Sequence, residues 1–473
     1  MAGEHVTPEA EGTIRALAHA VLAADSRIIP PAAIEQAQLL LLDTIGCGLA
    51  GVHEEAAQAV AKVALAGGGT PQCPLIGRAQ KTDVLNAVLA NGAVIRVLDL
   101  NDYLIGDSKG EPEAGGHPSD NIPVALGFGS ARGRSGADVL AAIVIGYELF
   151  ARLQHMTDRS GPWDGVTASG LVAPAMAGRL MDLDEERLAH ALALGAMRAP
   201  TPSIVRSGHV SAAKSIANAL VAQAGAQAAL LAENGVTGPL AILDDARGLR
   251  DLFAHGDPSM LAAPFPAGGA IMRAHVKAYP CINTGQSAVA AALQLRAMLN
   301  GDAESLTQIE VVMADYRVIK RHQEDEGRIR PASREAADHS FPFLVAVTLL
   351  DGVLGPAQFE AERWRDPRVL ALMEKITMRR DANWNLRAPG AFPCTLRARG
   401  LGGREFMAEI PYPPGFSKDG LDRSAVIEKF RALAGSAIGR AAAQRIVDAV
   451  MEFHHSRSTA TLDTAIAIGG TLT

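Results

Sequence analysis

Basic charge is scarce in this chain of 473 residues. Lysine and arginine together number 44, against 51 aspartates and glutamates, which gives a net charge of −7. A protein that binds nucleic acid carries a basic patch or stripe, and this balance argues against one. The sequence therefore predicts no nucleic-acid partner.

Cysteines are also scarce, and none forms a C-x-x-C pair, so zinc and thioredoxin-like sites lack support. The four are Cys47, Cys73, Cys281 and Cys394. The acidic N-terminal stretch 1–12 lacks the basic and apolar regions of a signal peptide. The apolar stretch 215–232 carries serine, asparagine and glutamine among its alanines, which favours a buried helix over a membrane span. We therefore expect a cytoplasmic protein with no membrane partner.

Several catalytic signatures are missing as well. The chain has no phosphate-binding G-x-x-x-x-G-K-[ST], no G-x-G-x-x-G after a strand, no H-E-x-x-H and no G-x-S-x-G. The run Asp338-His339-Ser340 contains the residue types of a catalytic triad, but adjacency in sequence does not create triad geometry.

An acidic stretch offers the ligand types of a hard-metal site, although a solvated acidic loop explains the same residues. Its members are Asp99, Asp102, Asp107 and His117. We favour the solvated loop, so the sequence predicts no metal ion.

Helical spacing of apolar residues dominates the chain. The composition is 48% hydrophobic but only 4% aromatic, so the core must be aliphatic. Thr7-Pro8-Glu9 is typical of a helix start. Nearly all of the first 250 residues are predicted to be helical, because apolar residues recur at helical spacing in each segment. These segments are 15–24, 33–51, 83–100, 135–153, 168–180, 184–199 and 211–235.

The pattern changes after 255–269, which is rich in proline and glycine. Alternating apolar residues predict strands at 306–318, 374–380, 395–400 and 404–412, the last two joined as a hairpin through Gly400–Gly403. Helices are predicted at 285–299, 341–352, 366–376, 423–435 and 440–455. The simplest architecture is mainly α. A large all-helical domain comes from both chain ends, 1–269 and 413–473, and a smaller α+β domain, 270–412, is inserted.

A candidate site for proton chemistry is distributed along the chain. Two glycines precede His117 in the loop GGHPSDN, residues 115–121, and imidazole titrates near working pH. Asp99, Asp102 and Tyr103 lie just upstream in LDLNDYL. A lone histidine is more often structural, and Tyr103 is equally well explained as the edge of a core.

Three further residues have ionisable side chains at unusual positions in the sequence. Lys214 lies in an otherwise uncharged helix, where an ammonium is costly unless it is paired, faces a cavity or reaches the surface. Lys277 precedes the stiff turn AYPCIN, and His339 starts an apolar helix. Lysines near a general base can hold substrate carboxylates and stabilise the charge that builds on them.

Segments in the same order resemble the MmgE/PrpD family, whose members include 2-methylcitrate dehydratases, cis-aconitate decarboxylases and iminodisuccinate epimerases. The resemblance rests on these stretches: LLDTIGCGLAG, LDLNDYL, GGHPSDNIPVALG, WDGVTASG, AAKSIANALVAQAGAQAALLAENGVTGP, KAYPCINTGQSAVAAAL and SREAADHSFPFLVAVTLLDG. It implies a helical domain with a smaller lid domain, a homodimer, and an active site between domains for small di- or tricarboxylates. It also implies that no nucleotide, metal or prosthetic group is needed.

Residues carry over from the resemblance one by one. The expected catalytic residues are His117, Asp99, Lys214 and Tyr103. The expected substrate-binding residues are Lys277, Asp102, His339 and Ser340. Relatives commonly have histidines at three places where this chain has Asp164 or Gly165, Ala217 and Thr284.

Those missing histidines bear on the reaction, because a dehydratase needs an acid for the leaving hydroxyl as well as a base. We expect a lyase, either a dehydratase or a decarboxylase, that moves a proton next to a carboxylate. An epimerase on the same scaffold needs fewer acids and is the alternative. A catalytically degenerate binding protein is the second alternative.

Overall fold

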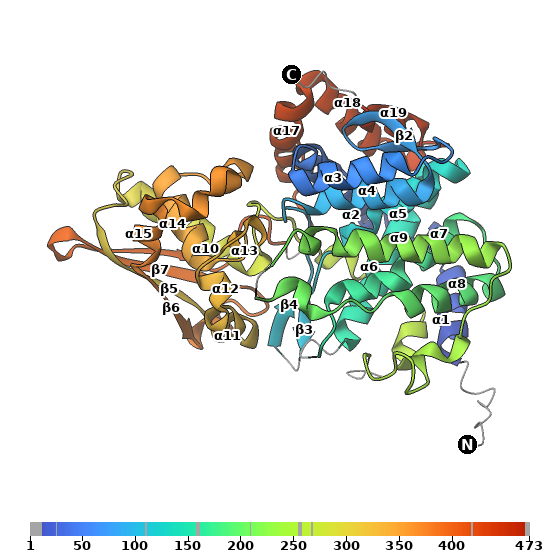
Figure 1. Ribbon diagram of the computed structural model, residues 1–473, viewed down its shortest axis with the longest axis horizontal. Helices are drawn as coiled ribbons and strands as arrows, with labels where there is room; N and C mark the ends of the chain where they lie inside the picture. Colours follow the sequence, from blue (N-terminus) through green and yellow to red (C-terminus); the bar gives the residue numbers. More distant parts are fainter. Residues whose placement is uncertain are drawn as a thin grey trace.

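The computed structural model describes residues 12–468 except 25, 109–110, 158–160, 209, 254–257, 266–267 and 418–419. The predicted helix start at Thr7-Pro8-Glu9 lies outside these residues, and the first described helix, α1, spans Gly12–Ala23. The chain is mainly α-helical, which confirms the predicted fold class. In Figure 1 the helices of the first half fill one end of an elongated molecule, and a small sheet with its covering helices forms the other end.

The predicted helices of the first half are confirmed, and side chains at their starts explain several boundaries. Asp83 accepts hydrogen bonds from the backbone at the start of α4, and Ser135 forms a capping box with Asp138 at the start of α6. The elements after α1 are α2 (Pro31–Gly51), α3 (Glu55–Ala66), α4 (Val84–Arg96), α5 (Ile122–Arg132), α6 (Gly136–Met156), α7 (Ser169–Leu180), α8 (Glu185–Arg198) and α9 (Ala213–Glu233).

Two short hairpins interrupt these helices, so the prediction of nearly continuous helix is wrong there. The first pairs β1 (Cys73–Leu75) with β2 (Arg78–Thr82), and the second pairs β3 (Ile105–Ser108) with β4 (Glu111–Ala114), both antiparallel. Strands of three to five residues are too short to show a clear period of two. The second hairpin also contains glycine and proline in place of the usual β-branched residues.

The predicted strands of the second half form one four-stranded sheet in the order β6-β5-β7-β8. β5 and β6 are parallel, while β7 is antiparallel to both β5 and β8. The predicted hairpin through Gly400–Gly403 is confirmed, because Arg399 on β7 pairs with Glu405 on β8. The strands are β5 (Leu306–Ala314), β6 (Ile376–Asp381), β7 (Cys394–Gly400) and β8 (Glu405–Ile410).

Helices α10 and α14 pack on each other beside this sheet (Figure 1). Val311 and Leu396, register partners on β5 and β7, are fully buried, and burying each such side chain is worth about 1.5–3 kcal/mol. The helices of this half are α10 (Gln286–Met298), α11 (Arg317–Glu324), α12 (Glu326–Ile329), α13 (Arg334–Ala337), α14 (Phe341–Asp351), α15 (Pro367–Met373) and α16 (Asn383–Arg387).

The C-terminal helices return to the first half of the chain and complete its core (Figure 1). They are α17 (Arg423–Ile438), α18 (Arg440–Met451) and α19 (Ala460–Ile466). Helix α17 packs on α2 so closely that a Cβ at Gly46 would lie 2.9 Å from the Phe430 ring. A larger residue at this position would force the two helices apart.

The buried apolar residues form two main clusters, and the chain crosses between them twice. One cluster takes residues between 14 and 276 and between 426 and 466, and the other takes residues between 281 and 408. The first crossing between the clusters therefore runs from Val276 to Cys281 and includes Lys277. This crossing brings the two halves of the candidate site together.

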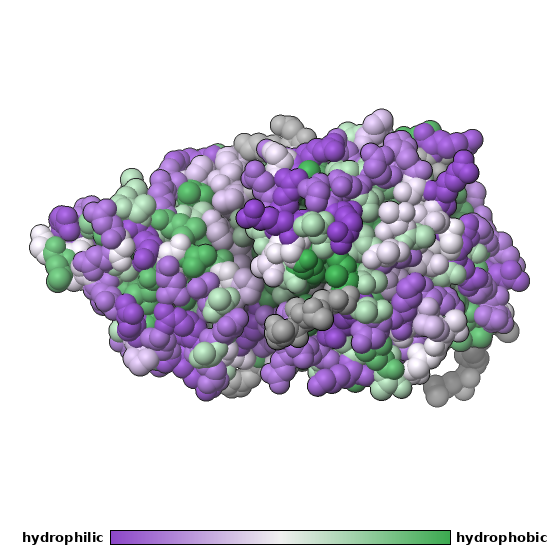
Figure 2. Space-filling model, turned by 90° about the horizontal axis from the view of Figure 1, so that it is seen from above, coloured by the Kyte–Doolittle hydropathy of each residue, from purple (hydrophilic) through white to green (hydrophobic). Residues whose placement is uncertain are grey.

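Helix α9 is the described helix whose length and composition alone would allow it to cross a membrane. It packs against α4, α7 and α8, and 61% of its most apolar window is buried inside the protein. A buried core helix of a globular protein has this environment, in line with the sequence-based expectation for 215–232. The face of the molecule in Figure 2 is mostly hydrophilic, with hydrophobic side chains in scattered groups.

Candidate active site

A cavity of about 310 Å³ lies where the two clusters meet. Four residues singled out from the sequence line it: Asp99, His117, Lys277 and His339. Asp99 follows α4, and His117 precedes the short 3₁₀ helix Pro118–Asn121. Lys277 lies on the crossing between the clusters, and His339 precedes α14. The fold thus brings together residues that are up to 240 positions apart.

Asp99 is the centre of the charged network. Its backbone is left-handed, with φ of 51°, which is uncommon for a residue other than glycine and turns the chain sharply after α4. Arg96 donates to Oδ1 at 2.6 Å, Lys277 also contacts Oδ1, and Nζ of Lys214 lies 3.2 Å from Oδ2. Burial opposes ionisation of Asp99, but these cations outweigh it and hold its pKa well below the usual value.

His117 lies beside Asp99 in a defined tautomer. Nδ1 is 2.5 Å from the carbonyl oxygen of Asp102, which can only accept, so the imidazole proton is on Nδ1. Nε2 then carries the lone pair, and it lies 3.9 Å from Oδ1 of Asp99. Burial, together with the positive charges of Arg96 and Lys277, lowers the pKa of His117 well below its usual value. The ring is therefore neutral and able to accept a proton through Nε2.

Buried polar contacts of Asp102 hold the segment that carries His117 in place. Asp102 accepts hydrogen bonds from the Tyr147 hydroxyl at 2.7 Å and from the backbone N–H of Ser119 at 3.3 Å. Burial raises the pKa of Asp102 to about 7, although the side chains of Ser119 and Tyr147 oppose this shift. A Cβ at Gly115 would lie 2.6 Å from the backbone nitrogen of Gly106, so the hairpin and the histidine loop require glycine there.

Lys214 finds buried partners in the second half of the chain. Nζ donates to Oδ1 of Asp338 at 2.6 Å and to Oδ2 at 2.8 Å, and it lies 3.1 Å from Nδ1 of His339. The side chain is only 2% exposed and does not line the cavity. A buried ammonium needs such compensation, so the paired interpretation of Lys214 holds and the surface interpretation does not.

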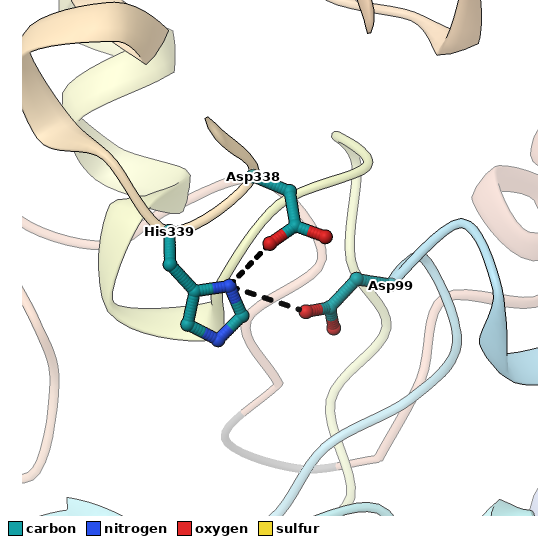
Figure 3. Close-up of side chains that lie close together, drawn as sticks. All are labelled: Asp99, Asp338 and His339. Carbon is teal, nitrogen blue, oxygen red and sulfur yellow. Dashed lines mark hydrogen bonds and ion pairs between the residues drawn. The ribbon is translucent and has the colours of Figure 1, made fainter. Parts of the chain in front are cut away.

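Asp99, Asp338 and His339 also have the spacing of a metal site within the described residues, since one ligand atom of each lies within 4.8 Å of the others (Figure 3). However, Nζ of Lys214 lies within 3.2 Å of an atom of each of them. This ammonium group already supplies the positive charge that a metal ion would bring to these three residues.

Besides Lys214, three residues expected from the sequence lie outside the cavity lining. Tyr103 is buried and pairs through its backbone with His275, and the two rings are 5.1 Å apart. Ser340 caps α14, where its hydroxyl accepts from the backbone N–H of Phe343 at 3.3 Å. Asp102 contributes its backbone carbonyl to His117, and its carboxyl points to Tyr147.

The structure also places in the cavity wall charged residues that the sequence did not single out. Arg206 pairs with Asp164 at 2.7 Å, and Arg328 pairs with Asp325 at 3.1 Å. Arg206 and Arg328 lie in polar segments that resemble ordinary solvated loops. No sequence signal therefore separates these two arginines from surface charges.

His322, another lining residue that the sequence did not single out, contacts the hydroxyl of Thr284, Nε2 to Oγ1, at 3.1 Å. Thr284 stands where the resemblance places a histidine, so an imidazole from α11 lies beside this position. Arg328 contacts Nδ1 of His322. An arginine can only donate, so Nδ1 accepts and the proton of the neutral ring lies on Nε2, toward Thr284.

Comparison with known families gives matches over both halves of the chain. Residues 15–261 match the MmgE/PrpD N-terminal domain, and residues 279–453 match the MmgE/PrpD C-terminal domain. The chain is 25% identical over 448 residues to 2-methylcitrate dehydratase of Salmonella typhimurium, covering 89% of this chain and 90% of that protein. It is 23% identical over 449 residues to cis-aconitate decarboxylase of Aspergillus terreus, covering 89% of each. The chain belongs to the MmgE/PrpD family.

Proposed function

We propose that this member of the MmgE/PrpD family is a cofactor-independent lyase, a dehydratase or a decarboxylase, that acts on a small di- or tricarboxylate. The observation that carries the proposal is the state of His117: its proton is held on Nδ1 by a backbone carbonyl, and Nε2 lies in the cavity beside Asp99. A neutral imidazole with one fixed proton and one free lone pair is suited to act as a general base.

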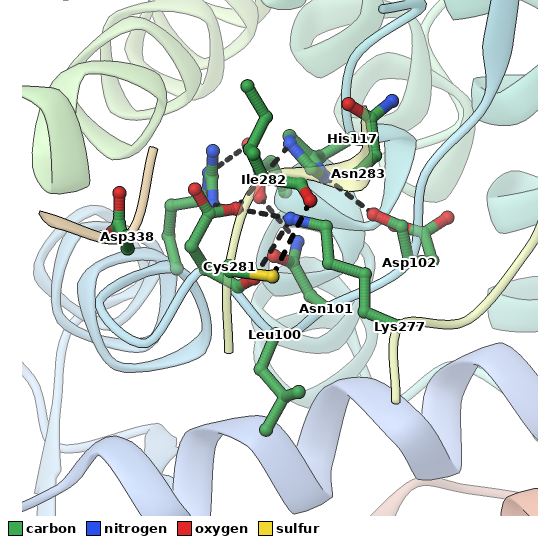
Figure 4. Close-up of polar contacts among 12 residues, drawn as sticks. Leu100, Asn101, Asp102, His117, Lys277, Cys281, Ile282, Asn283 and Asp338 are labelled. Atoms are coloured by element: carbon green, nitrogen blue, oxygen red, sulfur yellow. Dashed lines mark hydrogen bonds and ion pairs between the residues drawn. The ribbon is translucent and has the colours of Figure 1, made fainter. Parts of the chain in front are cut away.

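The cavity fits such a substrate in size and charge. Its volume of about 310 Å³ is at the lower end of small-molecule pockets. Lys277 is completely buried, lines the cavity, and donates to the backbone carbonyl of Asp99 at 2.9 Å. Its ammonium group would hold a substrate carboxylate next to Nε2 of His117 (Figure 4).

For a dehydration or an epimerisation, the proposed first step is proton transfer from the carbon next to that carboxylate. The C–H bond breaks, its proton moves to Nε2 of His117, and the electron pair passes into the carboxylate held by Lys277. Asp99, which is ionised and 3.9 Å away, stabilises the imidazolium that forms. Stabilisation of developing charge by groups that are already in place is commonly the largest contribution to catalysis.

The two lyase reactions differ in the group that leaves the substrate. In a dehydration the electron pair forms a carbon–carbon double bond and the hydroxyl on the adjacent carbon leaves as water. In a decarboxylation no C–H bond breaks: the carbon–carbon bond to a carboxylate breaks, CO₂ leaves, and the electron pair left on the substrate takes up a proton that His117 has first accepted from solvent. Relatives named for each reaction match the chain at similar identity, so both are proposed.

An epimerase on the same scaffold is the second candidate. It is favoured by the residues at the three places where the resemblance expects histidines. Asp164 is paired with Arg206, Thr284 carries a hydroxyl, and Ala217 carries no acid. An epimerase returns the proton to the same carbon and needs no acid for a leaving group.

A panel of carboxylates in D₂O tests these alternatives: 2-methylcitrate, citrate, cis-aconitate, malate and tartrate. A new alkene or release of CO₂ supports a lyase, whereas deuterium incorporation with inversion and no change in composition supports an epimerase. If no compound shows turnover or exchange, the proposal of a proton-transfer enzyme fails. We also propose a cytoplasmic homodimer, which light scattering after gel filtration and cell fractionation would check.

A further inference from the structure

We propose that His339 is a second proton-transfer residue of this site, which exchanges a proton with the substrate through Nε2 while His117 acts on the α-carbon. This role goes beyond substrate binding by His339 and rests on the proposed function. It provides a candidate for the second acid or base that the histidines of relatives would supply at the places of Asp164 or Gly165, Ala217 and Thr284.

The two imidazoles flank one carboxylate in one cavity. Nε2 of His117 lies 3.9 Å from Oδ1 of Asp99, and Nδ1 of His339 lies 3.7 Å from Oδ2. Both rings line the cavity, but they come from opposite sides of the crossing between the two clusters. A substrate bound next to Asp99 would therefore have an imidazole from each half of the protein within reach.

Its carboxylate partners determine the tautomer of His339. Nδ1 makes a hydrogen bond to Oδ1 of Asp338 and faces Oδ2 of Asp99 (Figure 3). Ionised carboxylates only accept, so the proton of the neutral ring lies on Nδ1. Within the described residues, Nε2 has no hydrogen-bond partner, and in Figure 3 it points away from both carboxylates.

Lys214 does not need the lone pair of Nδ1, although it lies 3.1 Å away. Its ammonium group has three N–H donors, and it has acceptors in the Asp338 carboxylate, Oδ2 of Asp99 and the backbone carbonyl of Glu335. All three N–H donors of Lys214 therefore have acceptors while Nδ1 of His339 keeps its proton. Burial, with Lys214, lowers the pKa of His339 to about 3, so the ring is neutral in the empty site.

Asp338 is the positioning residue of this pair. It is 1% exposed, Lys214 binds both of its carboxylate oxygens, and its backbone carbonyl accepts from the N–H of Ile282 at 2.9 Å. A buried aspartate that accepts from Nδ1 orients an imidazole and stabilises the imidazolium formed when Nε2 takes up a proton.

The proton balance can be written for a dehydration. His339 takes one proton from solvent onto Nε2 when the anionic substrate binds. The C–H proton then moves to Nε2 of His117, the C–O bond breaks, and the hydroxyl leaves as water with the proton from His339. His117 returns its proton to solvent, so both imidazoles end neutral. In an epimerisation, His339 would instead give its proton to the opposite face of the same carbon.

The test uses two variants of the full-length protein with the panel compound that exchanges its α-proton in D₂O. In His339→Asn the amide can replace Nδ1 toward Asp338, but nothing replaces Nε2. In His339→Gln a longer amide can reach the position of Nε2 but cannot transfer a proton. We expect kcat to fall by about 10²–10⁴-fold in both, the usual range for loss of an acid or base. In a dehydration, His117 can still exchange the α-proton, so deuterium exchange in His339→Asn should stay within about tenfold of the wild type.

A matched control is His275→Asn, which changes another buried histidine that stacks on Phe416 and does not line this cavity. Its kcat should stay close to that of the wild type once folding is confirmed by thermal unfolding. Wild-type kcat in either His339 variant overturns the role of His339 alone. Wild-type kcat in His339→Gln with a raised KM in His339→Asn would assign His339 to binding only. Absence of both turnover and exchange in the wild type for every panel compound overturns the proposed function as well.

Discussion

The ammonium group of Lys214 lies 2.6 Å from the carboxylate of Asp338, a residue 124 positions later in the chain. This contact joins α9 of the first apolar cluster to the segment before α14 in the second. The same ammonium group lies 3.2 Å from Asp99. One buried cation therefore links the two halves of the candidate site and balances two of its carboxylates.

Lys214→Met should cost about 3–5 kcal/mol in the free energy of unfolding, because it leaves buried carboxylates without their counter-charge. Asp99 keeps Arg96 and Lys277, so most of this cost should come from Asp338. Urea unfolding measures it. The double variant Lys214→Met/Asp338→Asn should recover part of the loss, since it also removes the uncompensated charge.

The control for this variant is Lys320→Met. The Lys320 side chain is 54% exposed, and its Nζ lies 3.8 Å from Glu324. An exposed pair of this kind is worth at most about 1 kcal/mol. A loss in Lys214→Met no larger than that in Lys320→Met would contradict the buried ion pair.

Asp102→Asn should change how stability depends on pH. The pKa of Asp102 is raised from 3.8 to about 7 by burial, so the folded state binds more protons than the unfolded state between these values. The free energy of unfolding of the wild type should therefore fall as pH rises from about 4 to about 7, by up to about 4 kcal/mol from this group. An asparagine does not titrate, so its curve should be flatter.

Urea unfolding of both proteins between pH 4 and pH 7.5 checks this expectation. Other buried acids such as Asp120, whose pKa is raised to about 6, are present in both proteins and cancel in the comparison. Parallel curves for the wild type and Asp102→Asn would show that Asp102 ionises normally in the folded protein.

Arg206→Met should weaken substrate binding more than turnover. Arg206 lines the cavity and pairs through Nε with Asp164, which fixes the guanidinium group at the cavity wall. A hydrogen bond from a charged group contributes about 1.5–3 kcal/mol, so KM should rise about 10- to 100-fold with a smaller change in kcat. Steady-state kinetics of this variant and of the exposed Arg187→Met give the comparison. Equal KM values would exclude Arg206 from binding.

The helices and the main sheet could be predicted from the sequence because each element carries its own periodic signal. Ile309, Val311 and Met313 alternate along β5, and the apolar residues of α2 and α17 recur at helical spacing. The short hairpins 73–82 and 105–114 lacked such a signal. Their positions depend on contacts with distant segments, such as the hydrogen bond from the backbone N–H of Gly77 to the carbonyl of Ile466.

The candidate site was only partly predictable for a related reason. A lysine in an uncharged helix indicates that a partner must exist, but nothing in the sequence identifies Asp338 as that partner. Arg206 and His322 became candidate site residues only because the fold places them in the cavity wall. The tautomer of His117 depends on a backbone carbonyl, which every residue has and no motif reveals.

The most direct test of the account is α-proton exchange by His117→Gln. Wild-type protein and the variant are incubated in D₂O with the panel carboxylate that exchanges fastest, and deuterium in the recovered substrate is measured by mass spectrometry. With the melting temperature close to that of the wild type, we predict that exchange and turnover both fall by about 10²–10⁴-fold. Exchange at the wild-type rate in a folded His117→Gln would contradict the assignment of His117 as the base.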